Sequence, residues 1–130
     1  ISMTNEFKNS IMALAAPASV QDALYPDFVA KGDELVLDYS NALSAINIKQ
    51  ELDEKQQDVL GVLEDYLTVN AGEEFATMYC DTSALYTDSR WEEIRGLAKA
   101  FIKVMDWTYS APEKNQATYL NAEFSQKNTS

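Results

Sequence analysis

Apolar residues recur at three- and four-residue steps along most of the chain, which is the period of an α-helix with one buried face. The clearest case lies between residues 89 and 105, where the apolar positions are separated by three, four, three and four residues: Trp91, Ile94, Ala98, Phe101 and Met105. We expect these five side chains to face the core together. No segment shows a sustained alternation of apolar and polar residues, so the pattern favours helices over strands.

Residues that cap helices mark where the elements begin. We expect a first helix at 5–16 and a second at 33–46 with Asp33 as its N-cap. Asp53 and Gln56 have the spacing of a capping box, which predicts a third helix that ends before Gly72. Ser89 and Glu92 have the same spacing, so we expect them to open the helix that carries Trp91.

The shorter segments are assigned from the same cues. Residues 19–24 are expected to form a short turn capped by Ser19, and 73–80 a short helix, whereas 81–88 are expected to form a loop. A last helix is expected from Pro112, with three apolar side chains inward: Tyr119, Leu120 and Phe124. Residues 125–130 read as a frayed polar tail, and residues 1–2, which precede Met3, as an expression remnant.

The length and the absence of linkers indicate a single domain. The chain has 130 residues, enough to enclose one core, and its four glycines are scattered rather than gathered into a flexible tract. We therefore predict one all-α domain over residues 1–130, a compact bundle of four to six helices.

Charge narrows the classes of partner. The net charge is −11, and residues 22–93 hold 17 Asp or Glu against four Lys or Arg. Such a field repels nucleic acid and anionic lipid and attracts basic proteins, so neither nucleic acid nor membrane is expected as a partner. The lone cysteine, Cys80, favours a reducing compartment, which we take to be the cytoplasm, and no apolar run approaches the ~20 residues that span a bilayer.

The sequence carries little equipment for catalysis. It contains no histidine, which removes the commonest general base and metal ligand. Residues 81–92 have acids and hydroxyls at the spacing of a calcium-binding loop, but Leu85 and Tyr86 occupy positions that need a ligand and a glycine. A basic stripe of Arg95, Lys99 and Lys103 could receive an anion, but we expect it to neutralise acids of a neighbouring helix and the negative end of its own helix dipole. We expect no enzymatic activity, cofactor or metal.

One segment combines acids, tyrosines and a predicted loop, which is typical of a protein-binding surface. Its candidate partner-binding residues are Glu73, Glu74, Tyr79, Asp81, Tyr86 and Asp88. For Tyr79, a place in the core is an equal alternative. If this segment is not the interface, the second choice is another acidic group: Asp27, Asp33, Glu34 and Asp38.

These features resemble, at the level of class, the small acidic all-helical immunity proteins of bacteria, which neutralise a cognate toxin. The acid- and tyrosine-containing segment EEFATMYCDTSALYTD (73–88) carries the resemblance, which contains no family motif and transfers no functional residue. It implies a non-catalytic inhibitor that covers the active site of a basic effector. Two alternatives stay open: an inhibitor that mimics nucleic acid, and a helical adaptor or regulatory subunit.

Overall fold

The computed structural model describes residues 2–114, with side chains from residue 5 onward. This part of the chain contains seven α-helices and no strand, which confirms the predicted all-α bundle. The helices are α1 (Ser2–Ala15), α2 (Ala18–Ala23), α3 (Lys31–Ala45), α4 (Glu54–Val69), α5 (Ala76–Cys80), α6 (Ala84–Thr87) and α7 (Ser89–Val104). Two short 3-10 helices, η1 (Ile48–Glu51) and η2 (Glu73–Phe75), flank α4.

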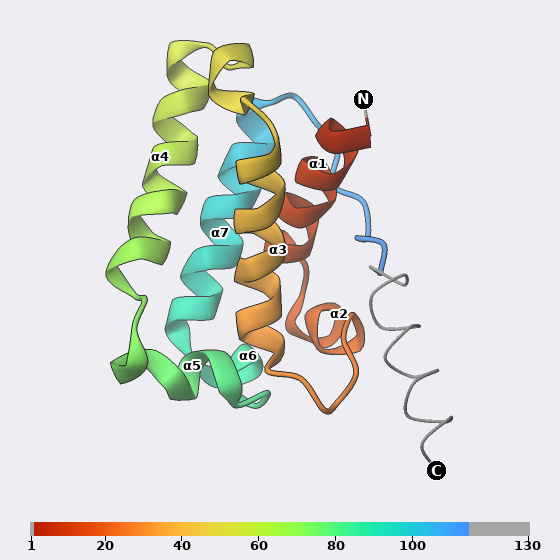
Figure 1. Ribbon diagram of the computed structural model, residues 1–130, viewed down its shortest axis with the longest axis vertical. Helices are drawn as coiled ribbons and strands as arrows, with labels where there is room; N and C mark the ends of the chain where they lie inside the picture. Colours follow the sequence, from red (N-terminus) through yellow and green to blue (C-terminus); the bar gives the residue numbers. More distant parts are fainter. Residues whose placement is uncertain (1, 115–130) are drawn as a thin grey trace.

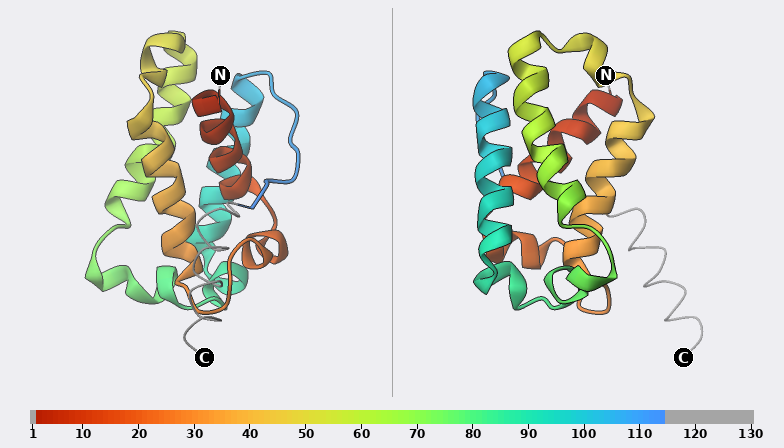
Figure 2. Two further views of the ribbon diagram at one scale, coloured as in Figure 1. Left: turned by 45° about the vertical axis from the view of Figure 1, so that its right-hand side comes forward. Right: turned by 90° about the vertical axis from the view of Figure 1, so that its left-hand side faces the viewer.

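Four long helices form an up-and-down bundle (Figure 1). In that view α3 and α7 run upward, while α1 and α4 run downward. α1 packs against both α3 and α7, and α4 packs on α7. Figure 2 shows that α1 crosses the others obliquely. We call the end that carries α2, η2, α5 and α6 the lower end, and the end that carries η1 and the last turn of α7 the upper end.

The core follows the predicted apolar face of α7 for most of its length. Trp91, Ile94, Ala98 and Phe101 are fully buried, as expected. Phe101 meets the rings of Phe7 and Trp107 nearly edge-on. Met105 is only partly buried, because it is the C-cap residue of α7 and lies beyond the last helical turn.

Close backbone packing joins the lower end to the bundle. Gly32 lies in the first turn of α3, where an added Cβ would come within 2.7 Å of the Tyr79 carbonyl oxygen and 2.9 Å of the Trp91 ring. The Trp91 indole N–H donates a 2.8 Å hydrogen bond to the Met78 carbonyl oxygen. Because both contacts involve α5, this short helix is held against α3 and α7 rather than free at the surface.

Of the helix starts predicted from caps, one is confirmed. Asp53 and Gln56 form a reciprocal capping box at the start of α4. Asp33 is not an N-cap, since Lys31 and Gly32 are drawn into the interior and α3 begins two residues earlier. Ser89 is not one either, because the Asp88 carboxylate accepts the Arg90 N–H and makes Ser89 the first residue of α7.

The short segments differ more from expectation. Ser19 lies inside α2, whose N-cap position is held by Pro17. Residues 81–88 were expected to be a loop but contain α6, because Leu85 is fully buried and draws the segment into a helical turn. The chain is not helical from 110 to 114, so no helix begins at Pro112. The predicted inward residues Tyr119, Leu120 and Phe124 and the tail 125–130 lie outside the described residues.

Candidate protein-binding surface at the lower end

The lower end brings together most of the acids and tyrosines that the sequence singles out. Glu73 and Glu74 are exposed on η2, Asp81 is exposed between α5 and α6, and Tyr86 on α6 is 52% exposed. The loop before α3 adds Phe28, an aromatic residue that is 55% exposed and was not among the predicted site residues. Acids and two solvent-facing rings therefore share one end of the bundle.

Tyr79 belongs to the core. Its side chain is 8% exposed and packs edge-on against Trp91, and its hydroxyl donates a 2.6 Å hydrogen bond to the Asn70 carbonyl oxygen. Burial, with the negative charge of Asp33 nearby, raises the pKa of Tyr79. Of the two alternatives left open by the sequence, the structure therefore supports the core one.

Asp88 holds the junction between α6 and α7. Its carboxylate caps α7 and forms a 2.6 Å ion pair with the Arg90 guanidinium, which holds the pKa of Asp88 below its usual value. The same guanidinium lies over the ring of Phe75. The negative charge of Asp88 is thus balanced by Arg90 within the protein, whereas the exposed acids of the segment 73–88 have no such partner among the described residues.

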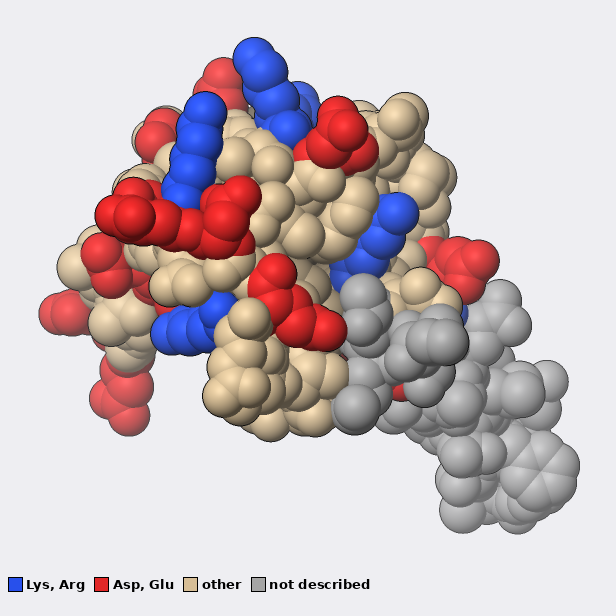
Figure 3. Space-filling view, turned by 90° about the horizontal axis from the view of Figure 1, so that it is seen from above, with Lys and Arg blue, Asp and Glu red and all other residues tan. Residues whose placement is uncertain are grey.

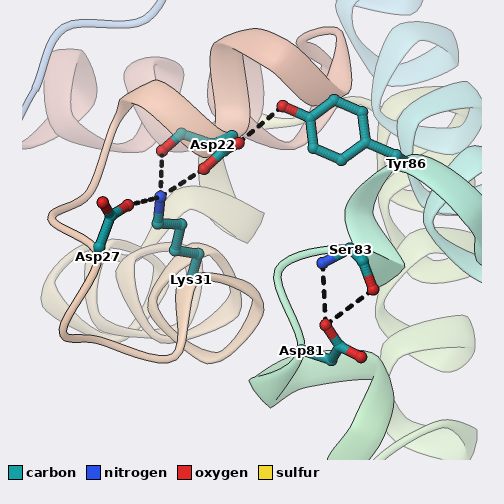
Figure 4. A network of polar contacts seen from close by, with 6 residues as sticks. All are labelled: Asp22, Asp27, Lys31, Asp81, Ser83 and Tyr86. Carbon is teal, nitrogen blue, oxygen red and sulfur yellow. Dashed lines mark hydrogen bonds and ion pairs between the residues drawn. The ribbon is translucent and has the colours of Figure 1, made fainter.

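A network of polar contacts centred on Lys31 orders the rest of the lower end (Figure 4). The Lys31 ammonium is buried and donates to the Asp22 carbonyl oxygen at 2.8 Å, to the Asp22 carboxylate, and to Asp27 Oδ1 at 2.9 Å. The Tyr86 hydroxyl donates to the other Asp22 oxygen at 2.7 Å. The network ties α2, the loop 24–30, α3 and α6 together and fixes the direction of the exposed Tyr86 ring.

The hydrogen bond from Lys31, followed by that from Tyr86, lowers the pKa of Asp22. The pKa of Lys31 is raised: burial acts against its charge, but the bonds to Asp22 and Asp27 outweigh it. Both groups are therefore charged at neutral pH.

The balance of charge at this end is strongly negative. Residues 17–34 and 72–90 contain eight Asp or Glu and two Lys or Arg. Both bases, Lys31 and Arg90, are engaged in internal ion pairs. The exposed acids of these two segments are Asp27, Asp33, Glu73, Glu74 and Asp81.

The first and second choices of interface predicted from the sequence, the segment 73–88 and the acids between 27 and 38, largely form one surface. α3 packs on α5 and α2 packs on α6, so the loop 24–30 and the start of α3 adjoin the segment 73–88. Asp38 is the exception, because it lies two turns along α3 in a groove beside Tyr25. Asp22 was missed as a member of this surface; an isolated acid in a short helix gives no sign that it will meet Lys31 and Tyr86.

The basic stripe on α7 does not pair with acids of a neighbouring helix among the described residues, although Lys103 lies in the last turn of α7, where it faces the negative end of the helix dipole as expected. Among the residues that the structure describes, Arg95, Lys99 and Lys103 form no ion pair within 4.0 Å. Arg95 instead donates to the Gln21 side chain and the Leu85 carbonyl oxygen, both at 3.0 Å. It thereby joins α2, α6 and α7 through neutral partners, and burial lowers its pKa.

Other classes of site find no support in the part of the chain described. Within residues 2–114, no three potential metal ligands of the His, Cys, Asp or Glu type gather into a group. None of the described helices has the length and apolar character to cross a bilayer. Comparison with protein-family models, with curated proteins and with solved structures gives no match. Function is therefore inferred from the fold and the surface alone.

Proposed function

We propose that the protein is a non-catalytic binding protein that docks a basic protein partner on its lower end. One observation carries the proposal: exposed acids and two exposed aromatic rings share this end of the bundle, and both bases of the same segments are already ion-paired within the protein. No free cation of these segments offsets the negative field that a partner would meet. Such a field speeds association with a positively charged surface and selects against a negative one.

The aromatic rings supply the short-range part of the interaction. Phe28 and Tyr86 each leave about half of their surface in solvent, and aromatic residues at the centre of an interface contribute disproportionately to affinity. Tyr86 is pre-oriented by Asp22, so little conformational entropy is lost when a partner covers it. The acids then form a rim that guides the approach, and the rings form the contact.

In its sharper form, the proposal is that the protein is an immunity-type inhibitor that covers the active site of a basic effector or toxin. Occlusion needs tight, specific binding and no chemistry of its own, which suits a chain without histidine. This form predicts that inhibition is stoichiometric and ends when the complex dissociates.

The test uses two charge-reversal variants with the same net charge. The lower-end variant is Asp33→Lys, Glu73→Lys, Glu74→Lys, and the upper-end control is Glu51→Lys, Glu54→Lys, Asp58→Lys. The two sets are matched in structure, because Asp33 and Glu54 lie in the first turn of a long helix and Glu73 and Glu51 each lie in a 3-10 helix. A partner captured from the native host is purified, and its affinity for each folded variant is measured by calorimetry.

We expect the lower-end variant to lose affinity about 100-fold at low salt, and the control to lose about threefold or less. Equal losses would show that only net charge matters, and an unchanged lower-end variant would place the interface elsewhere. A separate titration of the partner's own activity tests the inhibitor: activity should fall linearly to zero at a 1:1 ratio. A partner that binds but stays fully active would support the binding surface and overturn the inhibitor.

A further inference from the structure

A groove of about 390 Å³ lies beside α1 and α3 and reaches the loop 24–30 at Leu24 and Tyr25. Its walls come from the first half of α1, the middle of α3, the residues after α2, and residues 113–114 at the end of the blue segment in Figure 1. Asn9 holds this last wall in place, since its side-chain amide exchanges two hydrogen bonds with the backbone of Glu113, at 2.9 and 2.7 Å. The volume is within the range of sites for small molecules.

The groove contains a carboxylate that is only partly solvated. Asp38 is half-buried, and its Oδ2 accepts a 2.7 Å hydrogen bond from the Tyr25 hydroxyl. Burial raises the pKa of Asp38, against the effect of the Tyr25 bond, and the charge of Glu34 raises it further. A carboxylate held out of water in this way gains more from a positively charged ligand than a fully solvated one does.

The remaining lining defines the sign and the shape of that ligand. Glu6 and Glu113 add negative charge, and Lys114 is the only base among the described residues that line the groove. The amide side chains of Asn5 and Asn41 offer further acceptors and donors. Ala13, Leu24 and Ala42 provide an apolar wall. The lining suits a small cation with an aliphatic body.

The position of the Tyr25 hydrogen bond on Asp38 also favours one kind of cation over the others. Because Oδ2 already accepts the Tyr25 hydroxyl, Oδ1 is the less engaged oxygen of Asp38, and a ligand that bonds to both oxygens must share Oδ2 with that hydroxyl. A guanidinium group gains most from two parallel bonds to one carboxylate, whereas an ammonium group donates three bonds in different directions and needs only one from each acceptor. A metal ion needs several oxygen ligands at once, and no group of three candidate acidic ligands occurs among the described residues.

We propose that this groove binds a small aliphatic primary amine as its ammonium ion, with Asp38 as the charged partner and the Ala13–Ala42 side packing on the aliphatic chain. The groove contains none of the exposed acids and rings on which the proposed function rests, so the two proposals stand or fall separately.

The test is a titration of the full chain with 1,4-diaminobutane, followed by two-dimensional NMR of the backbone and side-chain amides. We expect saturable shifts confined to the groove, including the side-chain amides of Asn5 and Asn41. The neutral 1,4-butanediol, which has the same chain length, should bind at least about tenfold more weakly, because it cannot form a charge-assisted bond.

Substitution of the carboxylate provides the second arm. Asp38→Asn should weaken the diamine about tenfold or more while leaving the fold intact, because the amide oxygen still accepts the Tyr25 hydroxyl. The matched control Asp58→Asn makes the same change of charge on an exposed face of α4 and should leave affinity unchanged. Equal losses in the two variants, or shifts spread over the acidic surface, would overturn the site.

A third arm distinguishes a free amine from a lysine side chain. N-acetyl-lysine methylamide presents the same ammonium group on a peptide-like body. We expect it to bind more weakly than the diamine, because its backbone groups must also fit the groove. Tighter binding of the lysine derivative would overturn the small-molecule proposal and assign the groove to a side chain of a protein partner.

Discussion

The two ends of the bundle carry similar numbers of charged residues but use them differently. The lower-end segments hold eight acids and two bases, whereas the upper-end segments 44–58 and 99–107 hold five acids and four bases. Figure 3 looks down on the upper end and shows Lys or Arg side chains beside Asp or Glu across it. The net charge of −11 is thus not spread evenly over the surface, because the fold places most of the excess negative charge at the lower end.

The lysines make the difference plain. At the lower end Lys31 has a side chain only 3% exposed and bonds to two carboxylates. At the upper end Lys49 is 64% exposed and reaches Glu64 at 3.6 Å, a pair that contributes little to stability. A base that is built into the fold leaves the surrounding surface more negative than its composition suggests, whereas an exposed base offsets the acids beside it.

The largest effects should come from the core beneath each end. Trp91→Ala and Phe101→Ala should each cost about 3 to 5 kcal/mol in the free energy of unfolding, measured by urea denaturation. Trp91 also donates a hydrogen bond to the Met78 carbonyl oxygen, so Trp91→Ala should let the amides of α5 and α6 exchange hydrogen faster than global unfolding allows. In Phe101→Ala the same amides should exchange only through global unfolding. The same pattern of hydrogen exchange in both variants would show that the lower end does not unfold separately from the rest of the bundle.

The next effect separates one glycine from the others. Gly32→Ala should destabilise the protein by about 1 to 3 kcal/mol, because the new Cβ would press on the Tyr79 backbone, which cannot move as a side chain could. Gly96→Ala on α7 has open space and should stabilise by about 0.5 to 1 kcal/mol. Thermal unfolding of both variants tests the opposite signs; a stabilising Gly32→Ala would contradict the close packing of α3 on α5.

Gly32 also shows where prediction from the sequence stops. The four long helices follow from local periodicity, and Asp53 with Gln56 gives a start that needs only neighbouring residues. Lys31 is placed by contacts with α2 and the loop 24–30, which precede it closely in the chain. Gly32 is placed by contacts with α5 and α7, which are distant along the chain. Asp33 follows the local rule for a cap and is overruled by those contacts.

The candidate surface divides in the same way. The exposure of four residues could be predicted from the acidic composition of the segment and its predicted loop, because local composition governs exposure: Glu73, Glu74, Asp81 and Tyr86. Burial of Tyr79 and neutralisation of Asp88 depend on Trp91, Asn70 and Arg90, whose positions require the fold. Phe28 could not be recognised as exposed, since an isolated apolar residue in a loop is as readily buried.

A smaller, pH-dependent effect tests whether the internal ion pairs stabilise the lower end. Asp22 has a lowered pKa, so its stabilisation is present above the ordinary carboxyl pKa of about 4 and is lost as the pH falls through the folded-state value. Asp22→Asn should therefore cost about 1 to 2 kcal/mol at pH 7, and the difference from the parent protein should shrink in acid. Urea denaturation between pH 7 and pH 3 measures it. The exposed upper-end control Asp58→Asn should change stability little at either pH, and a constant deficit for Asp22→Asn would contradict a charge effect.

The smallest effect concerns the hydroxyl that orients an exposed ring. In Tyr86→Phe the Asp22 carboxylate loses one of the two hydrogen bonds that lower its pKa and keeps the one from Lys31. The pKa of Asp22 should therefore rise but stay below its ordinary value, with little change in overall stability. Carbon-detected NMR titration of the carboxyl carbon measures the shift directly. The control is Tyr109→Phe, which removes the hydroxyl of another exposed tyrosine, one that bonds to no acid within residues 2–114, and should leave the Asp22 titration unchanged. If Tyr86→Phe also leaves the pKa of Asp22 unchanged, the Tyr86 hydroxyl does not bond to Asp22 when the protein is in solution. The exposed ring would then be free to rotate and would not be pre-oriented for a partner.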